Sequence, residues 1–291
     1  MIISSQGEVC SPNDDIKALD LHGTNALRDR LLQIQANSDS GEAALLAGAE
    51  IELENDKKAE LAKIEEARQA LQAFRNYLAQ SSGVAADALP NEEELEYSYN
   101  PDTQQCEITR LDGQDIELDL RRSSLQGELP LPPQLMVTRL LCQGNELTAL
   151  PELPANLTEL NCNSNQLTTL PELPASLTEL YCAHNQLVAL TELPPSLTLI
   201  TCGGNQLTFL PELPANLTDL HCGDNQLSAL PELPASLTEL YCAHNQLTTL
   251  PVLPTSLTTL DYAWNNNLGS DPATRAATQA LIDRGGSVST I

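Results

Sequence analysis

Apolar and polar positions repeat every 20 residues along the second half of the chain. Residues 151–170 read PELPANLTELNCNSNQLTTL, and the blocks that begin at 171, 191, 211, 231 and 251 follow without an insertion. The motif of this repeat is L-x-x-L-x-C-x-x-N-x-L, whose places we number 1 to 11, with copies that begin at 137 (where Val137 stands first), 157, 177, 197, 217, 237 and 257. A degenerate copy precedes them. It has Asp115 in place 1, Leu118 in place 4, Leu120 in place 6, Ser123 in place 9 and Leu125 in place 11. The chain therefore has seven clear repeats and one degenerate repeat.

This period and motif are the sequence signature of a leucine-rich-repeat solenoid. Apolar residues at places 4 and 6 alternate with polar ones, which predicts one short, half-buried strand per repeat. Successive strands are expected to pair in parallel about 4.8 Å apart. Two prolines three residues apart, such as Pro151 and Pro154, exclude an α-helix and predict an extended, polyproline-like return. The predicted fold class is an α+β repeat protein, a leucine-rich-repeat solenoid with short parallel strands, preceded by an N-terminal helical segment.

Asparagine occupies place 9 of every clear repeat. A side-chain amide there can satisfy backbone groups where the chain turns away from the strand. We therefore interpret this place as an internal hydrogen-bonded ladder and not as a functional site. Its members are Asn145, Asn165, Asn185, Asn205, Asn225, Asn245 and Asn265.

The segment before the repeats has helical composition. Residues 41–80 contain no proline and are rich in strong helix formers. One apolar stripe runs along this segment through Ile64, Ala67, Leu71, Phe74 and Leu78. Upstream, Thr24 can cap a second helix whose apolar face would hold Leu27, Leu31 and Ile34. We expect a helical hairpin or three-helix unit over about residues 13–80.

Capping elements are expected at both ends of the solenoid, because a terminal repeat otherwise exposes its core. Residues 94–99 and 106–111, with Asn-Pro-Asp between them, predict a β-hairpin. At the other end Asp271 can cap a helix, Pro272 fits its first position and Gly285 can end it. The expected apolar face of this helix consists of Ala273, Ala276, Ala277, Ala280 and Leu281. The expected organisation is a helical region and linker (1–93), a hairpin-like cap (94–115), repeats (116–268), and a capping helix and tail (269–291).

The charge balance excludes two classes of partner. Forty acidic residues against 14 Lys and Arg give a formal net charge of −26. Binding to nucleic acid or to an anionic membrane surface requires the opposite sign. No Lys or Arg lies between Arg139 and Arg275, so this region should attract a protein partner with a basic or mixed surface. The N-terminus has neither a basic region nor an apolar stretch that would predict a Sec signal peptide.

The longer pattern P-x-L-P-x-x-L-x-x-L-x-C-x-x-N-x-L resembles the bacterial-effector class of leucine-rich repeat, the YopM and IpaH type, over about residues 116–268. The resemblance implies a protein secreted by a bacterium, without a Sec signal peptide, that acts in the host cytoplasm. IpaH-type members continue into a ubiquitin-ligase domain with a cysteine nucleophile. Here only 23 residues follow Leu268, and the last cysteine, Cys242, lies inside a repeat. The chain is therefore more similar to YopM-like members, which implies no enzymatic activity.

The cysteines and histidines favour structural roles. Six cysteines fill place 6, where we expect small buried hydrophobes without disulfides, as in a reducing compartment. Cys10 and Cys106 lie outside this pattern. His184 and His244 share place 8 three repeats apart, too far to bind one metal, while His221 and Asp224 could touch but lack a third ligand. We expect no catalytic residue, no cofactor and no metal.

Candidate binding residues lie at places 3, 5, 7 and 8, which face away from the core. An acidic surface there is explained by solubility alone, but outward tyrosines and a tryptophan serve no core and are common interface anchors. Place 7 is mostly small after Asn163, which leaves room for a partner's side chains. The candidate partner-binding residues are Glu159, Glu179, Tyr181, His184, Leu199, Asp219, His221, Asp224, Glu239, Tyr241, His244 and Trp264.

The leading hypothesis is a non-enzymatic effector that binds or regulates a protein partner, either a host protein or another effector, through its sheet face. The alternative is a substrate-recognition adaptor for a separate ubiquitin ligase or kinase. An extracellular adhesin is disfavoured by the missing signal peptide and by the expected free thiols. Neither nucleic-acid binding nor membrane insertion is expected.

Overall fold

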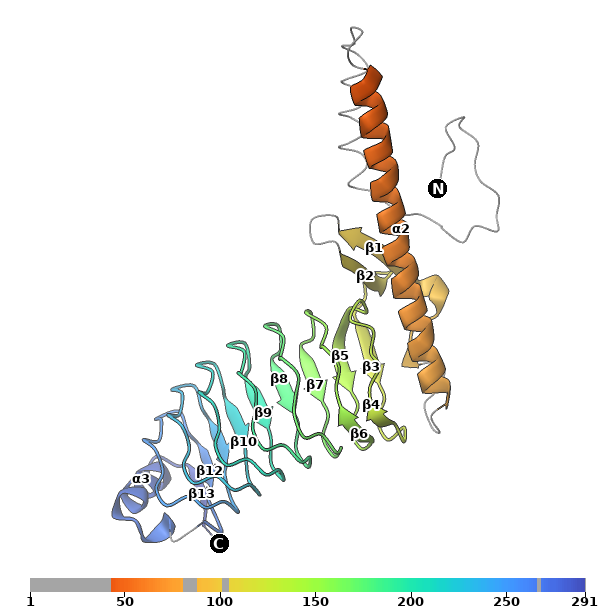
Figure 1. Ribbon diagram of the computed structural model, residues 1–291. Helices are drawn as coiled ribbons and strands as arrows, with labels where there is room; N and C mark the ends of the chain where they lie inside the picture. The colour runs from red at the N-terminus through yellow and green to blue at the C-terminus, as the bar shows by residue number, and fades with distance from the viewer. Residues whose placement is uncertain (1–42, 81–87, 101–104, 266–267, 291) are drawn as a thin grey trace.

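A computed structural model of the chain describes residues 43–80, 88–100, 105–265 and 268–290. Stacked repeats form one elongated solenoid, with a long helix beside its N-terminal end and a short helix at its C-terminal end (Figure 1). One face of the solenoid is a nine-stranded parallel sheet whose order follows the chain. Its strands are β3 (Ile116–Asp119), β5 (Val137–Leu141), β7 (Glu159–Asn161), β8 (Glu179–Tyr181), β9 (Leu199–Thr201), β10 (Asp219–His221), β11 (Glu239–Tyr241), β12 (Thr259–Asp261) and β13 (Ser287–Ser289). The predicted solenoid with short parallel strands is confirmed.

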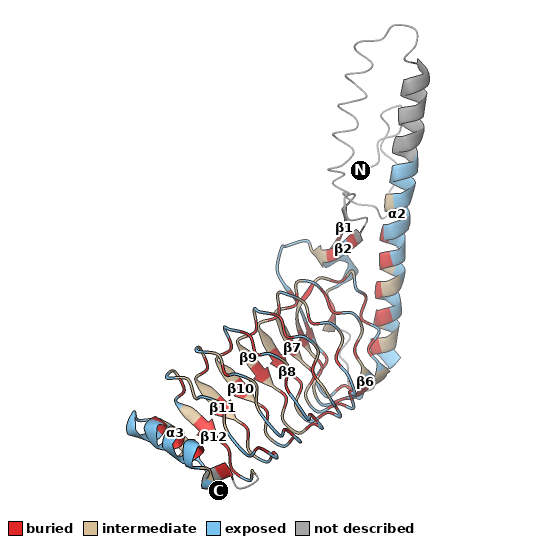
Figure 2. Ribbon diagram, turned by 60° about the vertical axis from the view of Figure 1, so that its left-hand side comes forward, coloured by how far each residue is buried: buried red, intermediate tan, exposed pale blue. Residues whose placement is uncertain are grey.

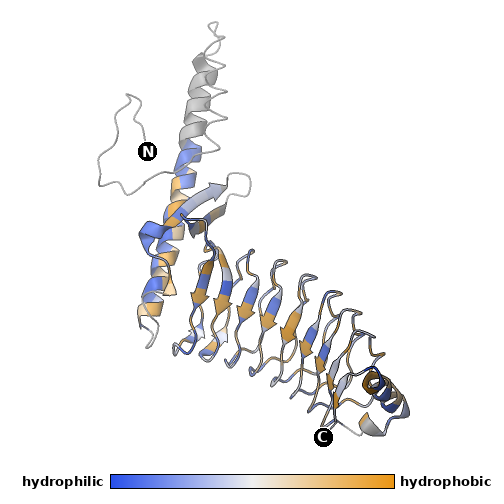
Figure 3. Cartoon of the chain, turned by 180° about the vertical axis from the view of Figure 1, so that it is seen from behind, coloured by the Kyte–Doolittle hydropathy of each residue, from blue (hydrophilic) through white to orange (hydrophobic). Residues whose placement is uncertain are grey.

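The core is a stack of identical layers. Strands β7 to β12 span places 3 to 5 of their repeats, and only place 4 is buried in each. Places 1, 6 and 11 join it inside; in one repeat these residues are Leu177, Cys182 and Leu187, each fully buried. Figure 2 shows this inner column in red along the solenoid, and apolar and hydrophilic residues follow one another along each repeat (Figure 3). The register explains why the 20-residue period is kept so strictly: a shift of one residue would turn the core outward.

The asparagine ladder is confirmed. Asn205 Nδ2 donates to the carbonyls of Cys182 (3.0 Å) and Cys202 (2.9 Å), while its Oδ1 accepts from the amide of Leu187 (3.0 Å). Asn205 is 9% exposed, and the two cysteines and Leu187 are fully buried. Each asparagine therefore joins its own repeat to the preceding one through groups that water does not reach.

A second ladder, of threonines at place 2, was not predicted from the sequence. Thr178 Oγ1 donates to the carbonyl of Thr158 (3.0 Å), and Thr198 Oγ1 to that of Thr178 (3.1 Å). Before each threonine the return ends in a tight turn, in which the amide of Leu177 donates to the carbonyl of Pro174 (3.0 Å). Proline suits this turn because it needs no amide hydrogen at that point.

The degenerate repeat departs from the predicted alignment. A register shift between Ile116 and Glu117 pairs Ile116, and not Asp115, with the place 1 residue Val137. Ile116 is 2% exposed, whereas Asp115 is exposed. A bulge thus supplies an apolar residue where the sequence count gives an acidic one. Two further short strands, β4 (Gln126–Glu128) and β6 (Glu146–Ala149), pair in parallel on the return side of these first repeats.

Helix α2 (Ala43–Gln80) covers the N-terminal end of the solenoid together with a hairpin. The hairpin consists of β1 (Leu95–Asn100) and β2 (Gln105–Arg110), which pair antiparallel after a short 3-10 turn, η2 (Glu92–Glu94). The predicted stripe from Ile64 to Leu78 is buried and shares one core with hairpin residues such as Ile108 and with the first repeat. Tyr77 extends this contact by donating from Oη to the carbonyl of Gln126 (3.1 Å).

The expected helix with Leu27, Leu31 and Ile34 lies outside the described residues, as does Cys10. Within the part of the chain that the structure describes, no helix is long and apolar enough to span a membrane.

The C-terminal cap consists of η3 (Leu268–Ser270), α3 (Pro272–Asp283) and β13. Asp271 caps α3 by accepting from the amide (2.8 Å) and hydroxyl (2.7 Å) of Thr274. Gly285 follows with a left-handed φ of 88°, and the chain returns as β13 beside β12, a strand that the sequence pattern did not predict.

The predicted apolar face of α3 is wrong at three of its five positions, while Leu281 is buried as predicted. Ala273, Ala276 and Ala280 are exposed, and the buried residues are Thr274, Thr278 and Leu281. Thr278 Oγ1 donates to the carbonyl of Thr274 (2.9 Å). Both threonine hydroxyls donate hydrogen bonds to nearby oxygens, so burying them costs little free energy of desolvation. Leaving the alanines exposed costs little as well, because a methyl group has a small apolar area.

Candidate protein-binding face

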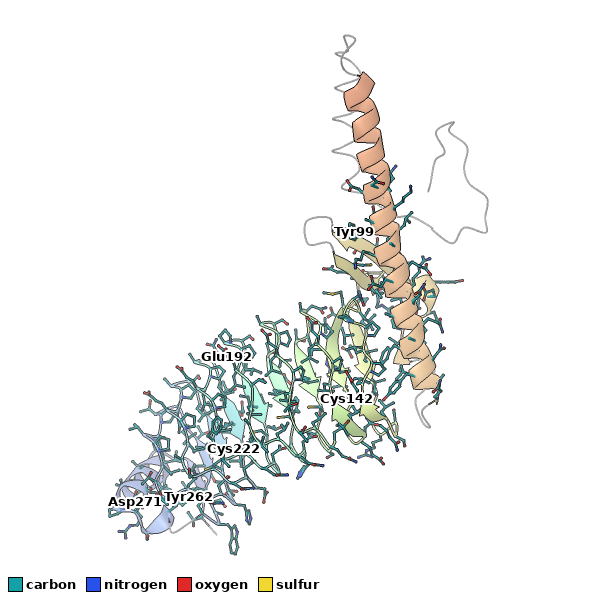
Figure 4. The ribbon with its side chains drawn as sticks, in the orientation of Figure 1. Tyr99, Cys142, Glu192, Cys222, Tyr262 and Asp271 are labelled. Carbon is teal, nitrogen blue, oxygen red and sulfur yellow. The ribbon has the colours of Figure 1, made fainter. Side chains whose placement is uncertain are left out.

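Places 3, 5 and 8 of the repeats line the outer side of the sheet. Strand residues at places 3 and 5 are half-buried by their neighbours, and place 8, in the turn that follows, is mostly exposed. All twelve candidate residues lie on this side and none is fully buried. Alternation along the strand therefore placed the eight candidates at places 3 and 5 correctly. Figure 4 shows Cys142 and Cys222 within the body of the solenoid and Glu192, on a return, at its periphery.

Two tyrosines are held against acidic neighbours of the same strand. Tyr181 Oη donates to Glu179 Oε2 (2.7 Å), and Tyr241 Oη donates to Glu239 Oε2 (3.2 Å). Burial and then the Glu179 carboxylate raise the pKa of Tyr181 to about 12, and burial and then the Glu239 carboxylate raise the pKa of Tyr241. Both phenols are therefore protonated near neutral pH, and each hydroxyl is hydrogen-bonded to a carboxylate of its own strand.

The charge on this face is divided along the solenoid. Arg139 donates from Nε to Glu159 (2.7 Å) and from Nη1 to Glu117 (3.1 Å), and these bonds raise the pKa of Arg139. Arg121 forms an ion pair with Asp119 (2.6 Å). The first repeats are thus nearly neutral, whereas the repeats beyond residue 160 carry acidic residues and no Lys or Arg.

Place 8 adopts a left-handed backbone throughout the stack, a conformation that the repeat pattern did not predict. Positive φ angles near 54° occur at Ser164, His184, Asp224, His244 and Trp264, and at 66° for Gly204. Glycine is the residue that takes this conformation without steric cost, so Gly144 and Gly204 were the available signal. The left-handed turn aims each place 8 side chain over the next repeat. His184 lies over Gly204, where an added Cβ would stand 2.5 Å from His184 Nδ1.

Ring contacts between repeats occur near the C-terminal end of this face. His221 and Tyr241 have ring centroids 4.3 Å apart, and His244 stacks on Trp264 with centroids 5.7 Å apart and planes within 10°. Burial lowers the pKa of His221 against the opposing effect of Glu239 and Asp219. His221 therefore contacts Tyr241 on the next strand, and no interaction with Asp224 is observed among the described contacts.

The interpretation of place 7 as room for a partner is wrong at three positions. A Cβ added to Gly203 would lie 3.1 Å from the carbonyl oxygen of Gly223, and one added to Gly223 would lie 3.1 Å from that of Ala243. Ala263 is 4% exposed. Close approach of the next repeat's backbone explains the two glycines.

The described cysteines are free and buried, as predicted for the repeats. Burial raises the pKa of Cys142, Cys202 and Cys242 to about 12. Cys106 belongs to the core under the hairpin, and burial followed by Glu107 raises its pKa to about 11. These thiols are thus protonated at neutral pH and poor nucleophiles. No group of three or more potential metal ligands occurs among the described residues.

Comparisons with known proteins agree with the fold. The family described as Leucine Rich Repeat matches at residues 156–177. The solved Shigella effector LRR domain is 31% identical, with a TM-score of 0.50, over 62% of this chain and 82% of that domain. YopM of Yersinia pestis is 40% identical over 51% of this chain and 43% of its own (TM-score 0.49), and YopM of Yersinia enterocolitica is 40% identical over 47% and 30% (TM-score 0.45). The chain thus spans less than half the length of these YopM chains. No curated protein matches the chain.

Proposed function

The chain belongs to the bacterial-effector family of leucine-rich-repeat proteins, and from this premise we propose that it is a non-enzymatic effector that binds or regulates one protein partner through the outer side of its parallel sheet. The partner has a basic or mixed surface and is a host protein or another effector. The division into residues 1–93, 94–115, 116–268 and 269–291 stays part of this proposal.

One observation carries the proposal: the sheet face presents partly exposed aromatic rings among acidic residues. Tyr181 and Tyr241 are only half-buried and Trp264 is 66% exposed, so none of them fills the core. A face that serves solubility alone gains nothing from large rings, because they expose apolar area to water. A ring with an apolar body and a polar edge is the usual anchor of a protein interface.

A binding function without catalysis agrees with the chemistry of the described residues. The repeat cysteines are buried and protonated, so they offer no thiolate for the nucleophilic step of a cysteine-dependent ligase. Action in the host cytoplasm after secretion is supported by the relatives, which are effector proteins of Yersinia and Shigella. Free thiols suit that reducing compartment.

A capture experiment with matched charge reversals tests the proposal. The full chain is immobilised and exposed to host-cell extract, and bound proteins are identified by mass spectrometry. The face variant is Glu179→Lys with Glu239→Lys; the control is Glu192→Lys with Glu212→Lys, which makes the same charge change on the exposed returns. We expect the face variant to lose a protein that the control retains. Equal capture by both variants would place the interface elsewhere and contradict the proposal.

The identity of the captured protein decides between the two hypotheses on function. A ligase or kinase bound at a surface other than the sheet face, together with a second protein on that face, would favour the adaptor. A single partner on the sheet face supports direct binding.

A further inference from the structure

We propose that the C-terminal end of the sheet face binds an arginine side chain of the protein partner at two ring pairs, His221 with Tyr241 and His244 with Trp264, which together we call the ring cluster. The guanidinium would stack on the exposed side of the ring cluster and pair with a neighbouring carboxylate. This inference rests on the proposed function, because it names the chemistry that the partner brings to the same face.

Two nearly identical repeats provide an internal comparison. Residues 171–190 and 231–250 differ only at Val188 against Thr248 and at Ala189 against Thr249. Both therefore carry the same tyrosine at place 5 and the same histidine at place 8. Their surroundings differ. Tyr181 pairs across the sheet with Asn161 and Thr201, whereas Tyr241 pairs with His221 and Asp261.

The histidines differ in the same way. His184 lies over the backbone of Gly204, whereas His244 stacks on the ring of Trp264. One repeat sequence thus stands as an ordinary layer in the middle of the solenoid and as part of a ring cluster near its C-terminal end. The ring cluster therefore depends on His221 and Trp264, which the two neighbouring repeats contribute.

Trp264 is placed where the backbone favours glycine. Its φ is 55°, at a place where other repeats hold Gly144 and Gly204. A large side chain costs conformational free energy in this region, and Trp264 recovers little of that cost through burial, since it is 66% exposed. Tyr262 and Ala263 beside it are buried and already close the last layer (Figure 4 labels Tyr262). Five other repeats hold a non-glycine residue in the same conformation, so what distinguishes Trp264 is a large ring that stays mostly exposed, and such a ring points to a role in binding.

Acidic groups surround the ring cluster, and compensating charges are missing from the same stretch of chain. Glu239 lies beside Tyr241, Asp224 occupies place 8 of the preceding repeat, and Asp261 precedes Trp264 in its turn. Residues 140–274 contain no Lys or Arg. The lowered pKa of His221 keeps that ring uncharged near neutral pH. An aromatic surface in a negative potential binds cations through the ring face and through charge together.

Arginine fits this arrangement better than lysine. Its guanidinium is planar and weakly hydrated, stacks on aromatic faces and can form two hydrogen bonds with one carboxylate at the same time. A lysine ammonium is a compact, strongly hydrated point charge that gains less from a flat ring. A surface that responded only to charge would not distinguish the two residues.

Trp264 reports directly on its own environment, because it is the only tryptophan of the chain. A blocked hexa-arginine peptide is titrated into the full chain and tryptophan emission is recorded; hexa-lysine of equal charge serves as the comparison. We expect a saturable change in emission and an affinity at least fivefold higher for hexa-arginine. Equal affinities that fall together with added salt would overturn the inference in favour of attraction by charge alone.

The duplicated repeats supply matched variants. His244→Ala should weaken hexa-arginine binding at least fivefold, which corresponds to about 1 kcal/mol. His184→Ala removes the same side chain from the same backbone conformation in an almost identical repeat and should leave the affinity unchanged. Melting temperatures of both variants verify that each is folded. Equal effects of the two substitutions would contradict the inference.

Failure of this inference and failure of the proposed function are distinguishable. The peptide titration uses no natural partner, so it tests the ring cluster alone. If hexa-arginine is not preferred while the capture of a partner still depends on Glu179 and Glu239, the proposed function stands and the arginine site does not. If the ring cluster prefers hexa-arginine but the capture ignores the sheet face, the proposed function fails.

Discussion

Removing one member of the asparagine ladder should destabilise the solenoid by about 3 kcal/mol. In Asn205→Ala the buried amide of Leu187 loses the side-chain oxygen that it donates to, at about 1–3 kcal/mol for an unsatisfied buried group. After this substitution the Cys182 carbonyl still accepts a hydrogen bond from Asn185 Nδ2 (3.2 Å), and the Cys202 carbonyl still accepts one from Asn225 Nδ2 (3.0 Å). Losing one of two donors at each adds about 0.5–1 kcal/mol per carbonyl.

Equilibrium unfolding in urea, followed by circular dichroism, measures this loss. The control is Gln206→Ala, the adjacent exposed residue of the same turn, which should change the free energy of unfolding by less than about 0.5 kcal/mol. Sharing of the Cys202 carbonyl makes a further prediction: Asn205→Ala with Asn225→Ala should cost more than the sum of the two single substitutions, since this carbonyl then loses both donors. A single-site loss as small as the control's, or strict additivity, would refute the ladder as a shared network.

Three further outcomes are expected. Thiol titration of the native chain should find the repeat cysteines unreactive, and denaturation without reductant should release all eight thiols of the chain; a lasting deficit of two or more would show disulfides. Glu179→Lys with Glu239→Lys should slow association with the partner and reduce its dependence on salt, and an unchanged rate would move the interface off this face. Asp271→Ala should speed amide exchange in α3 and β13. Because the Thr274 hydrogen bonds lower the pKa of Asp271, the wild-type cap should also weaken as pH falls from about 3.9 through that lower value; exchange insensitive to both changes would argue against the cap.

The fold could be predicted because every repeat places the same residue types in the same environment. Leu180 and Cys182 are apolar because both are fully buried, and the equivalent residues of the neighbouring repeats are buried in the same way. The 20-residue period alone therefore predicts the strand, the core and the turn of each repeat. Features that occur once were missed. The bulge at Ile116 depends on which residue meets Val137, and β13 depends on a left-handed turn at Gly285 after α3. These are tertiary choices that no local pattern encodes.

The sequence predicted which side chains of the candidate face point outward, but not which of them contact one another. Strand alternation placed Tyr181, Tyr241 and their neighbours on the outside. The stacking of His244 on Trp264 required knowledge of the left-handed conformation at place 8, which aims one repeat's side chain at the next. The prediction of free space at place 7 fails for the converse reason, since backbone oxygens of the following repeat occupy the space beside Gly203 and Gly223.

The central claim, that the sheet face is the protein-binding surface, is tested most directly by the affinity of the captured partner for Tyr181→Ala and Tyr241→Ala, measured beside the melting temperature. Truncating an interface anchor costs about 2 kcal/mol or more, so we expect each substitution to reduce affinity at least tenfold. Both side chains are only half-buried, so the melting temperature should change little, and Glu192→Ala on the opposite returns should alter neither quantity. A sharp fall in melting temperature with unchanged affinity would contradict the account and make these rings part of the scaffold.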